Sequence, residues 1–302
     1  MTQPDLPTRS PASALLVSLR PRQWLKNVLV FAAPLAAGSL LEPDVLVPSL
    51  LAFVAFCLIS SATYLINDVR DVEADRAHPT KRNRPIAAGQ LPVPIAIGAA
   101  GVLAVVALGI GLAVNLALFG TVLAYAIFTL GYSLVFKHEP VIELALLAVG
   151  FLLRAIAGGV AAEIPISRWF LIVAGFGSLF MAAGKRFSEL QRNIRDNGDA
   201  SKSGRRSLAG YTTGYLRFVW GLAAAVTVTA YCLWAFEVGL GESSFPFAEW
   251  SVLPFVLAIL RYAVDVDSGE AEAPEEVVLH DPVLMVLGIA WLALFGLGAL
   301  GV

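Results

Sequence analysis

The sequence predicts an all-α fold, a polytopic membrane bundle of about nine transmembrane helices. The 302-residue chain is 58% hydrophobic and 15% charged, with a mean hydropathy of +0.75, so lipid is expected to be its main solvent. Nine apolar runs approach the length of about 20 residues that crosses a bilayer. Lys and Arg residues gather on one side of these runs. The runs are too long for barrel strands, so one helical bundle accounts for the chain.

The predicted spans follow one another with short polar connections. They lie at 26–41, 46–66, 93–113, 116–136, 140–160, 166–183, 213–236, 248–264 and 282–301. Residues 1–25 are expected to form a cytoplasmic N-terminus with an interfacial helix, because SALLVSLRPRQW sets leucines and Trp24 beside Arg20 and Arg22. Residues 26–302 are expected to form a single transmembrane domain.

The orientation follows from the basic residues. With the N-terminus inside, 19 of the 21 Lys and Arg residues lie on the cytoplasmic side, and only Arg154 and Arg168 depart from it. We therefore expect a multi-pass protein of the plasma membrane whose polar groups face the cytoplasm.

The cysteines and histidines do not indicate metal or disulfide chemistry. Cys57 and Cys232 lie in separate apolar runs without CxxC spacing, and His78, His138 and His280 lie in three separate connections. Thiolate and zinc sites are therefore not expected.

The second predicted span runs into YLINDVRDVEADR, which carries a one-sided polar cluster. At about 100° per residue, Tyr64, Asn67, Asp68, Asp71 and Asp75 share one helical face. Clustered carboxylates repel one another unless a cation lies among them, and hard oxygen ligands suit Mg²⁺ shared with phosphate. The cluster therefore predicts a metal and phosphate site.

A basic stretch, TKRNRP, follows the cluster directly. Lys81, Arg82 and Arg84 are expected to donate to phosphate oxygens. The alternative is an ordinary solvated helix end, in which the acids pair with Arg70 and Arg76 and the basic residues serve only the positive-inside pattern.

The motif N-D-x-x-D-x-x-x-D, followed by K-R-x-R-P, resembles the first motif of the UbiA superfamily of intramembrane transferases. The span count and cytoplasmic loops are similar as well, so the resemblance covers nearly the whole chain and implies a UbiA-like fold. It also implies that Tyr132 and Lys137, in YSLVFK, match a Tyr/Lys pair near the site, while Tyr64 is expected to contact substrate as a member of the polar helical face. It implies that Mg²⁺ and the donor pyrophosphate are bound by Asn67 and by the catalytic carboxylates of Asp68, Asp71 and Asp75.

The chain departs from the superfamily after the sixth span. Usual members carry a second DxxxD motif there, whereas this chain has GKRFSELQR, with Lys185 and Glu189 in the corresponding positions. A cation in place of a carboxylate suggests a donor with a further anionic group, so both residues are expected to bind substrate. The alternative is a simple i,i+4 ion pair.

With this departure, RPRQWLKN, AYAIFTLGYSLVFKH, LLRAIAGGV, GSLFMAAGKR and LRYAVDVD together resemble one branch, the actinobacterial decaprenyl-phosphate phosphoribosyltransferases. The resemblance implies phosphoribosyl pyrophosphate as donor, a polyprenyl (decaprenyl) phosphate as acceptor, and a step in supplying lipid-linked arabinose for cell-wall arabinan. It implies no nucleic-acid partner and leaves a homo-oligomer open.

Two basic residues within or beside spans extend the expected site. An arginine deep in a span usually faces a polar cavity, so Arg154 is expected to bind substrate phosphate, or else to pair with Glu143 or Glu163. Lys26 is expected to reach the same cavity, with a snorkelling anchor as the alternative.

These expectations define a mechanism and two competitors. The lipid phosphate would attack ribose C1 as metal-stabilised pyrophosphate leaves. A UbiA-type prenyltransferase with a prenyl diphosphate donor and an aromatic acceptor is the first alternative, and the missing second motif argues against it. A transporter is the second, and its polar residues should line both halves of the bilayer.

Overall fold

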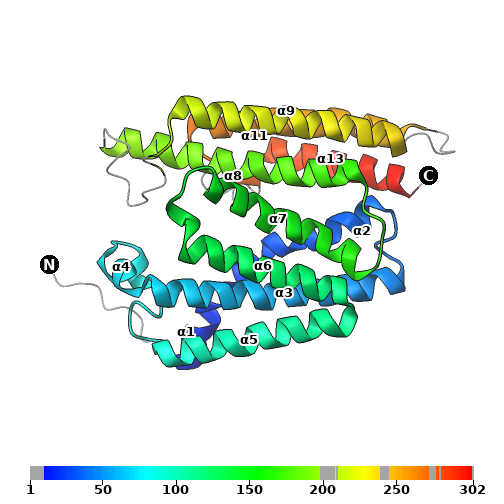
Figure 1. The fold of residues 1–302 in the computed structure, drawn as a ribbon. Coiled ribbons are helices and arrows are strands. Elements are labelled where there is room, and N and C mark those ends of the chain that lie inside the picture. The colour runs from blue at the N-terminus through cyan, green and yellow to red at the C-terminus, as the bar shows by residue number, and fades with distance from the viewer. Residues whose placement is uncertain are drawn as a thin grey trace.

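A computed structural model describes residues 10–197, 208, 210–238, 245–271, 277, 278 and 280–300. Within these residues the structure is helical, without strands, and the long helices run side by side in one bundle (Figure 1). Residues 1–9 of the expected cytoplasmic N-terminus, residues 198–207 and 209 between the sixth and seventh predicted spans, and residue 301 of the ninth predicted span lie outside the described part. The predicted all-α fold is confirmed.

Eight described helices are long and apolar enough to cross a membrane, and they match the second to ninth predicted spans. The first five are α3 (Pro43–Arg70), α5 (Val93–Val114), α6 (Leu116–Leu134), α7 (Ile142–Ala161) and α8 (Arg168–Asn197). The others are α9 (Thr213–Val238), the pair α10 (Phe247–Trp250) and α11 (Val252–Ser268), and α13 (Pro282–Ala299).

The first predicted span differs from expectation. Instead of one α-helix over 26–41, the chain forms a 3₁₀ helix, η1 (Pro21–Phe31, 11 residues), and then α2 (Ala32–Ala36, 5 residues). At rises of about 2.0 and 1.5 Å per residue the two would extend roughly 30 Å, which is comparable with a bilayer core. This segment completes the bundle of about nine membrane segments.

The 3₁₀ winding of η1 agrees with the spacing of inward-facing residues along η1 and the start of α2. Trp24, Asn27, Val30 and Ala33 recur every three residues, which is the period of a 3₁₀ helix, and the last three of them are buried. Gly158 of α7 permits this contact, because a Cβ there would overlap the backbone oxygen of Val30. Close backbone approach at a small residue is typical of packing between membrane helices.

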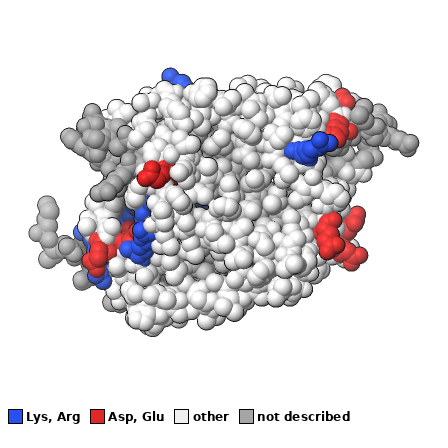
Figure 2. All heavy atoms as spheres, in the orientation of Figure 1, with Lys and Arg blue, Asp and Glu red and all other residues white. Residues whose placement is uncertain are grey.

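Short elements close the end of the bundle where α3 finishes. Ahead of η1 lies α1 (Pro11–Ser18), whose N-cap Ser10 accepts a hydrogen bond from the Ser13 amide, so the expected interfacial helix is present as a helix. Beyond α3 follow α4 (Val72–Ala77), η2 (Lys81–Asn83) and, after α6, η3 (Phe136–His138). Charged side chains gather at the two ends of the face drawn in Figure 2, and its middle is almost uncharged.

Candidate active site

The predicted acidic cluster lies where α3 ends and α4 begins. Asp71 is the C-cap residue of α3 and the N-cap residue of α4. The backbone amides of Asp71 and Asp75 donate to the carbonyl oxygens four residues earlier, those of Asn67 (2.9 Å) and Asp71 (2.8 Å). The spacing of one helix therefore continues across the junction. Glu73, on the opposite side, is 81% exposed and pairs with Arg76.

Two arginines neutralise the buried members of the cluster. Asp68 and Asp75 are each 3% exposed, and Arg84 Nη1 bridges them at 3.1 Å from Asp68 Oδ1 and 2.7 Å from Asp75 Oδ2. Arg20 donates through Nη2 to both oxygens of Asp68, at 2.6 and 2.8 Å, and its guanidinium lies over the ring of Tyr64. The two buried carboxylates therefore have guanidinium counter-ions.

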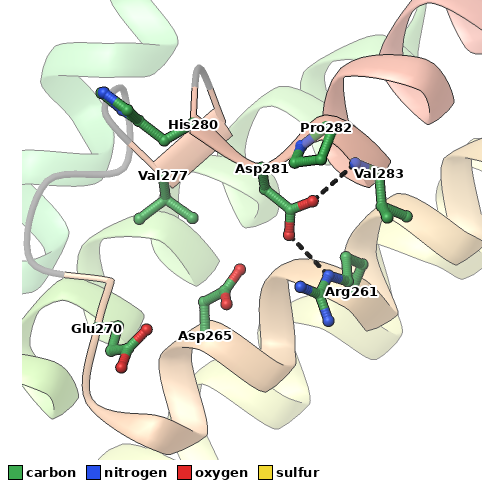
Figure 3. A pocket seen from close by; sticks show the side chains of 8 residues that line it. All are labelled: Arg261, Asp265, Glu270, Val277, His280, Asp281, Pro282 and Val283. Carbon is green, nitrogen blue, oxygen red and sulfur yellow. Dashed lines mark hydrogen bonds and ion pairs between the residues drawn. The ribbon is translucent and has the colours of Figure 1, made fainter.

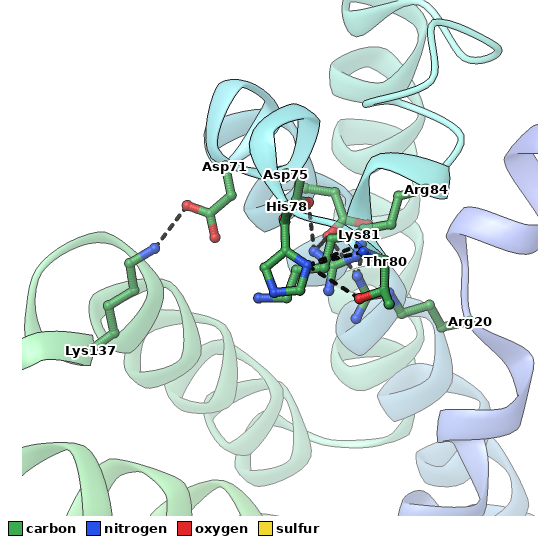
Figure 4. Close-up of polar contacts among 9 residues, drawn as sticks. Arg20, Asp71, Asp75, His78, Thr80, Lys81, Arg84 and Lys137 are labelled. Carbon is green, nitrogen blue, oxygen red and sulfur yellow. Dashed lines mark hydrogen bonds and ion pairs between the residues drawn. The ribbon is translucent and has the colours of Figure 1, made fainter. Parts of the chain in front are cut away.

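Asp71 faces away from this pair, as Figure 4 shows. Its Oδ1 accepts from Lys137 Nζ at 2.8 Å, and it is the most accessible of the three aspartates, with its side chain 26% exposed. Within the described residues, no three Asp, Glu, His or Cys side chains come together as a metal site. The metal-binding role of Asn67, Asp68, Asp71 and Asp75 therefore stays a prediction, and in this structure the three aspartates do not converge on one point. The helix turn between them sends Asp71 to Lys137, while Arg84 holds the other two.

The side chains of Asn67 and Asp71 suit Mg²⁺ by chemistry and placement. They are four residues apart on one helical face, both are only partly buried, and each offers oxygen. Within the described residues, nothing hydrogen-bonds to the Asn67 side chain. Mg²⁺ is commonly held by one or two protein oxygens together with substrate phosphates, so these two residues fit such an ion.

A second charged cluster, which the sequence reasoning missed, joins α6, α7 and α8. Arg186 is 2% exposed and donates to both oxygens of Glu143, which is 0% exposed, at 3.0 and 3.2 Å. Arg186 also donates to Glu189 Oε2 at 2.8 Å and to the Tyr132 hydroxyl at 3.2 Å. The structure thus brings two predicted residues, Glu189 and Tyr132, to one unpredicted arginine.

The remaining basic residues that were predicted for the site differ in their exposure. Lys81 and Arg82 of η2 are exposed, while Lys26 and Lys185 are half-buried. The ring of His78 closes the turn before η2 by accepting from the Thr80 amide at 3.2 Å (Figure 4).

Arg154 lies deep in α7, eleven residues and so roughly 16 Å from Glu143. It is buried and donates to Asn27 Oδ1 at 2.7 Å, the Tyr125 hydroxyl at 2.6 Å and the Gly150 oxygen at 2.8 Å. These three acceptors are uncharged, and the predicted contact of Arg154 with a substrate phosphate stays a prediction. Among the described residues Arg154 forms no ion pair with the alternative partners Glu143 and Glu163: it donates to those three groups, and Glu143 pairs with Arg186.

A cavity of about 490 Å³ opens elsewhere, at the ends of α11 and α13 (Figure 3). No residue predicted for the site lines it. Arg261 Nε donates to Asp281 Oδ2 at 2.7 Å, and the other Asp281 oxygen caps α13. Partial desolvation acts to raise the pKa of Asp281, but the bonds from Arg261 and two backbone amides hold it below its ordinary value. This cavity is separate from the α3 site.

The fold has close counterparts among solved structures. It resembles a UbiA homolog from Archaeoglobus fulgidus, solved bound to GPP and Mg²⁺, with a TM-score of 0.70 over 96% of this chain and all of that one, at 19% identity.

The sequence is much closer to two curated proteins, both named decaprenyl-phosphate phosphoribosyltransferase. The one from Corynebacterium glutamicum is 51% identical over 293 residues, covering 94% of this chain and 86% of that protein. The one from Mycolicibacterium smegmatis is 50% identical over 313 residues, covering 98% and 96%.

The family model of the UbiA prenyltransferase family matches residues 28–288, from η1 into α13. That stretch contains Asp71, Arg186, seven of the eight long apolar helices in full, and the start of α13. This multi-pass membrane protein therefore belongs to the UbiA prenyltransferase family.

Proposed function

We propose that this chain transfers the 5-phosphoribosyl group of phosphoribosyl pyrophosphate to a polyprenyl phosphate, in particular decaprenyl phosphate, at the cytoplasmic membrane face. The observation that carries the proposal is the identity of about half of all residues, over nearly the full chain, with proteins named for this reaction. The cationic site is compatible with it, because this donor bears a 5-phosphate in addition to its pyrophosphate.

The reaction exchanges one bond for another at ribose C1. An oxygen of the lipid phosphate forms a bond to C1 as the bond from C1 to the pyrophosphate oxygen breaks, with inversion at C1 if attack is direct. The acceptor is already an anion, so no protein base has to remove a proton. The protein then has to position both anions and balance their charge.

The residues of this chain divide that work by charge. Asn67 and Asp71 would hold Mg²⁺, which when bound neutralises the leaving pyrophosphate. Lys137, which contacts Asp71, donates to phosphate oxygens, and the exposed Lys81 and Arg82 supply further cationic donors. The positive-inside distribution supports a cytoplasmic position for these basic residues, where a soluble donor would reach them.

The test follows label from ribose-labelled phosphoribosyl pyrophosphate into organic-extractable lipid, using purified protein, decaprenyl phosphate, and Mg²⁺ or a chelator. We expect metal-dependent transfer that Asp71→Ala abolishes. The matched control is Glu73→Gln, which removes an exposed carboxylate two residues away and should leave transfer unchanged. No transfer by folded wild-type protein, with turnover of a prenyl diphosphate and an aromatic acceptor instead, would overturn the proposal.

A further inference from the structure

Arg186 is a fully buried cation at the cytoplasmic end of α8, and three helices converge on it. Its Nε and Nη2 contact the two oxygens of Glu143 on α7, and its Nη1 contacts Glu189 on α8 itself. Nη2 also donates to the Tyr132 hydroxyl on α6. A planar guanidinium held from this many directions has one orientation, so it is a rigid reference point.

The contact with Tyr132 fixes the direction of the phenol proton. A guanidinium has no lone pair to accept with, so the Tyr132 oxygen accepts from Arg186 and its own O–H must point elsewhere. In the part of the chain that the structure describes, no group accepts that proton, and the side chain is only half-buried. Tyr132 therefore has an oriented donor to offer.

The place of Tyr132 connects this donor with the other half of the site. It lies on α6 five residues before Lys137, whose ammonium reaches Asp71. The end of α6 and the η3 turn that follows it thus bring a phenol and an ammonium to the end of the bundle where the acidic cluster lies. A phenol polarised by a neighbouring cation is a strong donor to an anionic oxygen.

We propose that Arg186 is a positioning residue that, anchored by Glu143, orients the Tyr132 hydroxyl to donate a hydrogen bond to an anionic oxygen of the phosphoribosyl donor. The inference rests on the proposed function, since it assigns a contact within that reaction. Arg186 itself touches no substrate. Its effect passes through Tyr132, and Glu143 with Glu189 balances its charge.

The test is a mutant cycle on phosphoribosyl transfer, with purified variants in lipid nanodiscs. Tyr132→Phe removes only the hydroxyl. Arg186→Gln with Glu143→Gln removes the positioning pair together, so that no buried charge is left alone. The third variant combines all three changes, and Arg195→Gln, an exposed arginine further along α8, is the matched control.

We expect Tyr132→Phe and the double variant each to lower kcat/KM for the donor roughly ten- to hundredfold, the range of a hydrogen bond to a charged group. The triple variant should fall no further than Tyr132→Phe, and the KM of the lipid acceptor should not change. Losses that multiply in the triple variant would overturn the positioning role. So would a double variant that is fully active when folded.

Failure of the proposed function has a different signature. Wild-type protein would then transfer no phosphoribosyl group at all. An active wild type with multiplicative losses would overturn the inference on Arg186 alone.

Discussion

The buried pair of Arg186 and Glu143 makes a stability prediction that depends on which partner is removed. Arg186→Gln leaves the carboxylate of Glu143, at 0% exposure, without its counter-ion. Removal of one partner of a buried pair costs about 3–5 kcal/mol of unfolding free energy. Glu143→Gln is expected to cost less, about 1–3 kcal/mol, because Arg186 keeps Glu189 at 2.8 Å and the new amide can still accept one hydrogen bond.

The double variant separates this reasoning from simple loss of contacts. With both charges gone, the two amides can hydrogen-bond each other. The free energy of unfolding of the double variant should therefore lie within about 1 kcal/mol of that of Glu143→Gln, or above it. The assay is unfolding in mixed SDS and detergent micelles, followed by circular dichroism of the helices. Arg195→Gln serves as a surface control. A double variant whose loss equals the sum of the single losses would refute the account.

Further predictions concern the α3 site, the η1 contact and one tyrosine. Lys137→Ala should raise the KM of the donor about tenfold by removing a charge-assisted donor, whereas an unchanged KM would contradict a role for Lys137 beside Asp71. Gly158→Ala should lower the thermal midpoint by overpacking against η1, at a cost of about 1–3 kcal/mol, while Gly101→Ala, with nothing within 4 Å of its Cβ, should not. Burial raises the pKa of Tyr211 from 10.0 to about 12, so the unfolded chain ionises first. Stability should fall between about pH 10 and 12, and this fall should be smaller in Tyr211→Phe than in the unchanged protein.

The sequence predicted the spans because a long apolar run has one outcome in lipid, a helix that satisfies its own backbone. The polar cluster at the end of α3 was predicted for an equally simple reason, because Asn67 and Asp71 are spaced as neighbours on one face of a helix. The winding of the first segment was not. Its period of three, visible at Trp24, Asn27 and Val30, lies close to the period of an α-helix, so the spacing did not by itself distinguish a 3₁₀ helix from an α-helix.

The Arg186 cluster escaped sequence reasoning for a related reason. Arg186 stands next to Lys185 in a loop-like basic stretch, and the positive-inside pattern explains both without distinguishing them. The structure does distinguish them, because α8 continues past the predicted end at 183 and turns Arg186 inward. A signal was present in Glu143, an acid at the start of an apolar span, since a carboxylate there needs a cation from a neighbouring helix.

The two kinds of cation divide the site into fixed and exchangeable parts. Guanidinium groups hold Asp68, Asp75 and Glu143, all of them buried, and the rigid fork of arginine suits permanent pairs. Asp71 alone is paired with a lysine, a flexible point charge, and it is the most exposed aspartate of the motif. A carboxylate that is to take part in binding a metal and pyrophosphate must change partners when the donor arrives. Under the proposed function, the arginine pairs would frame the site, and the Asp71 and Lys137 pair would be the one that opens when the donor binds.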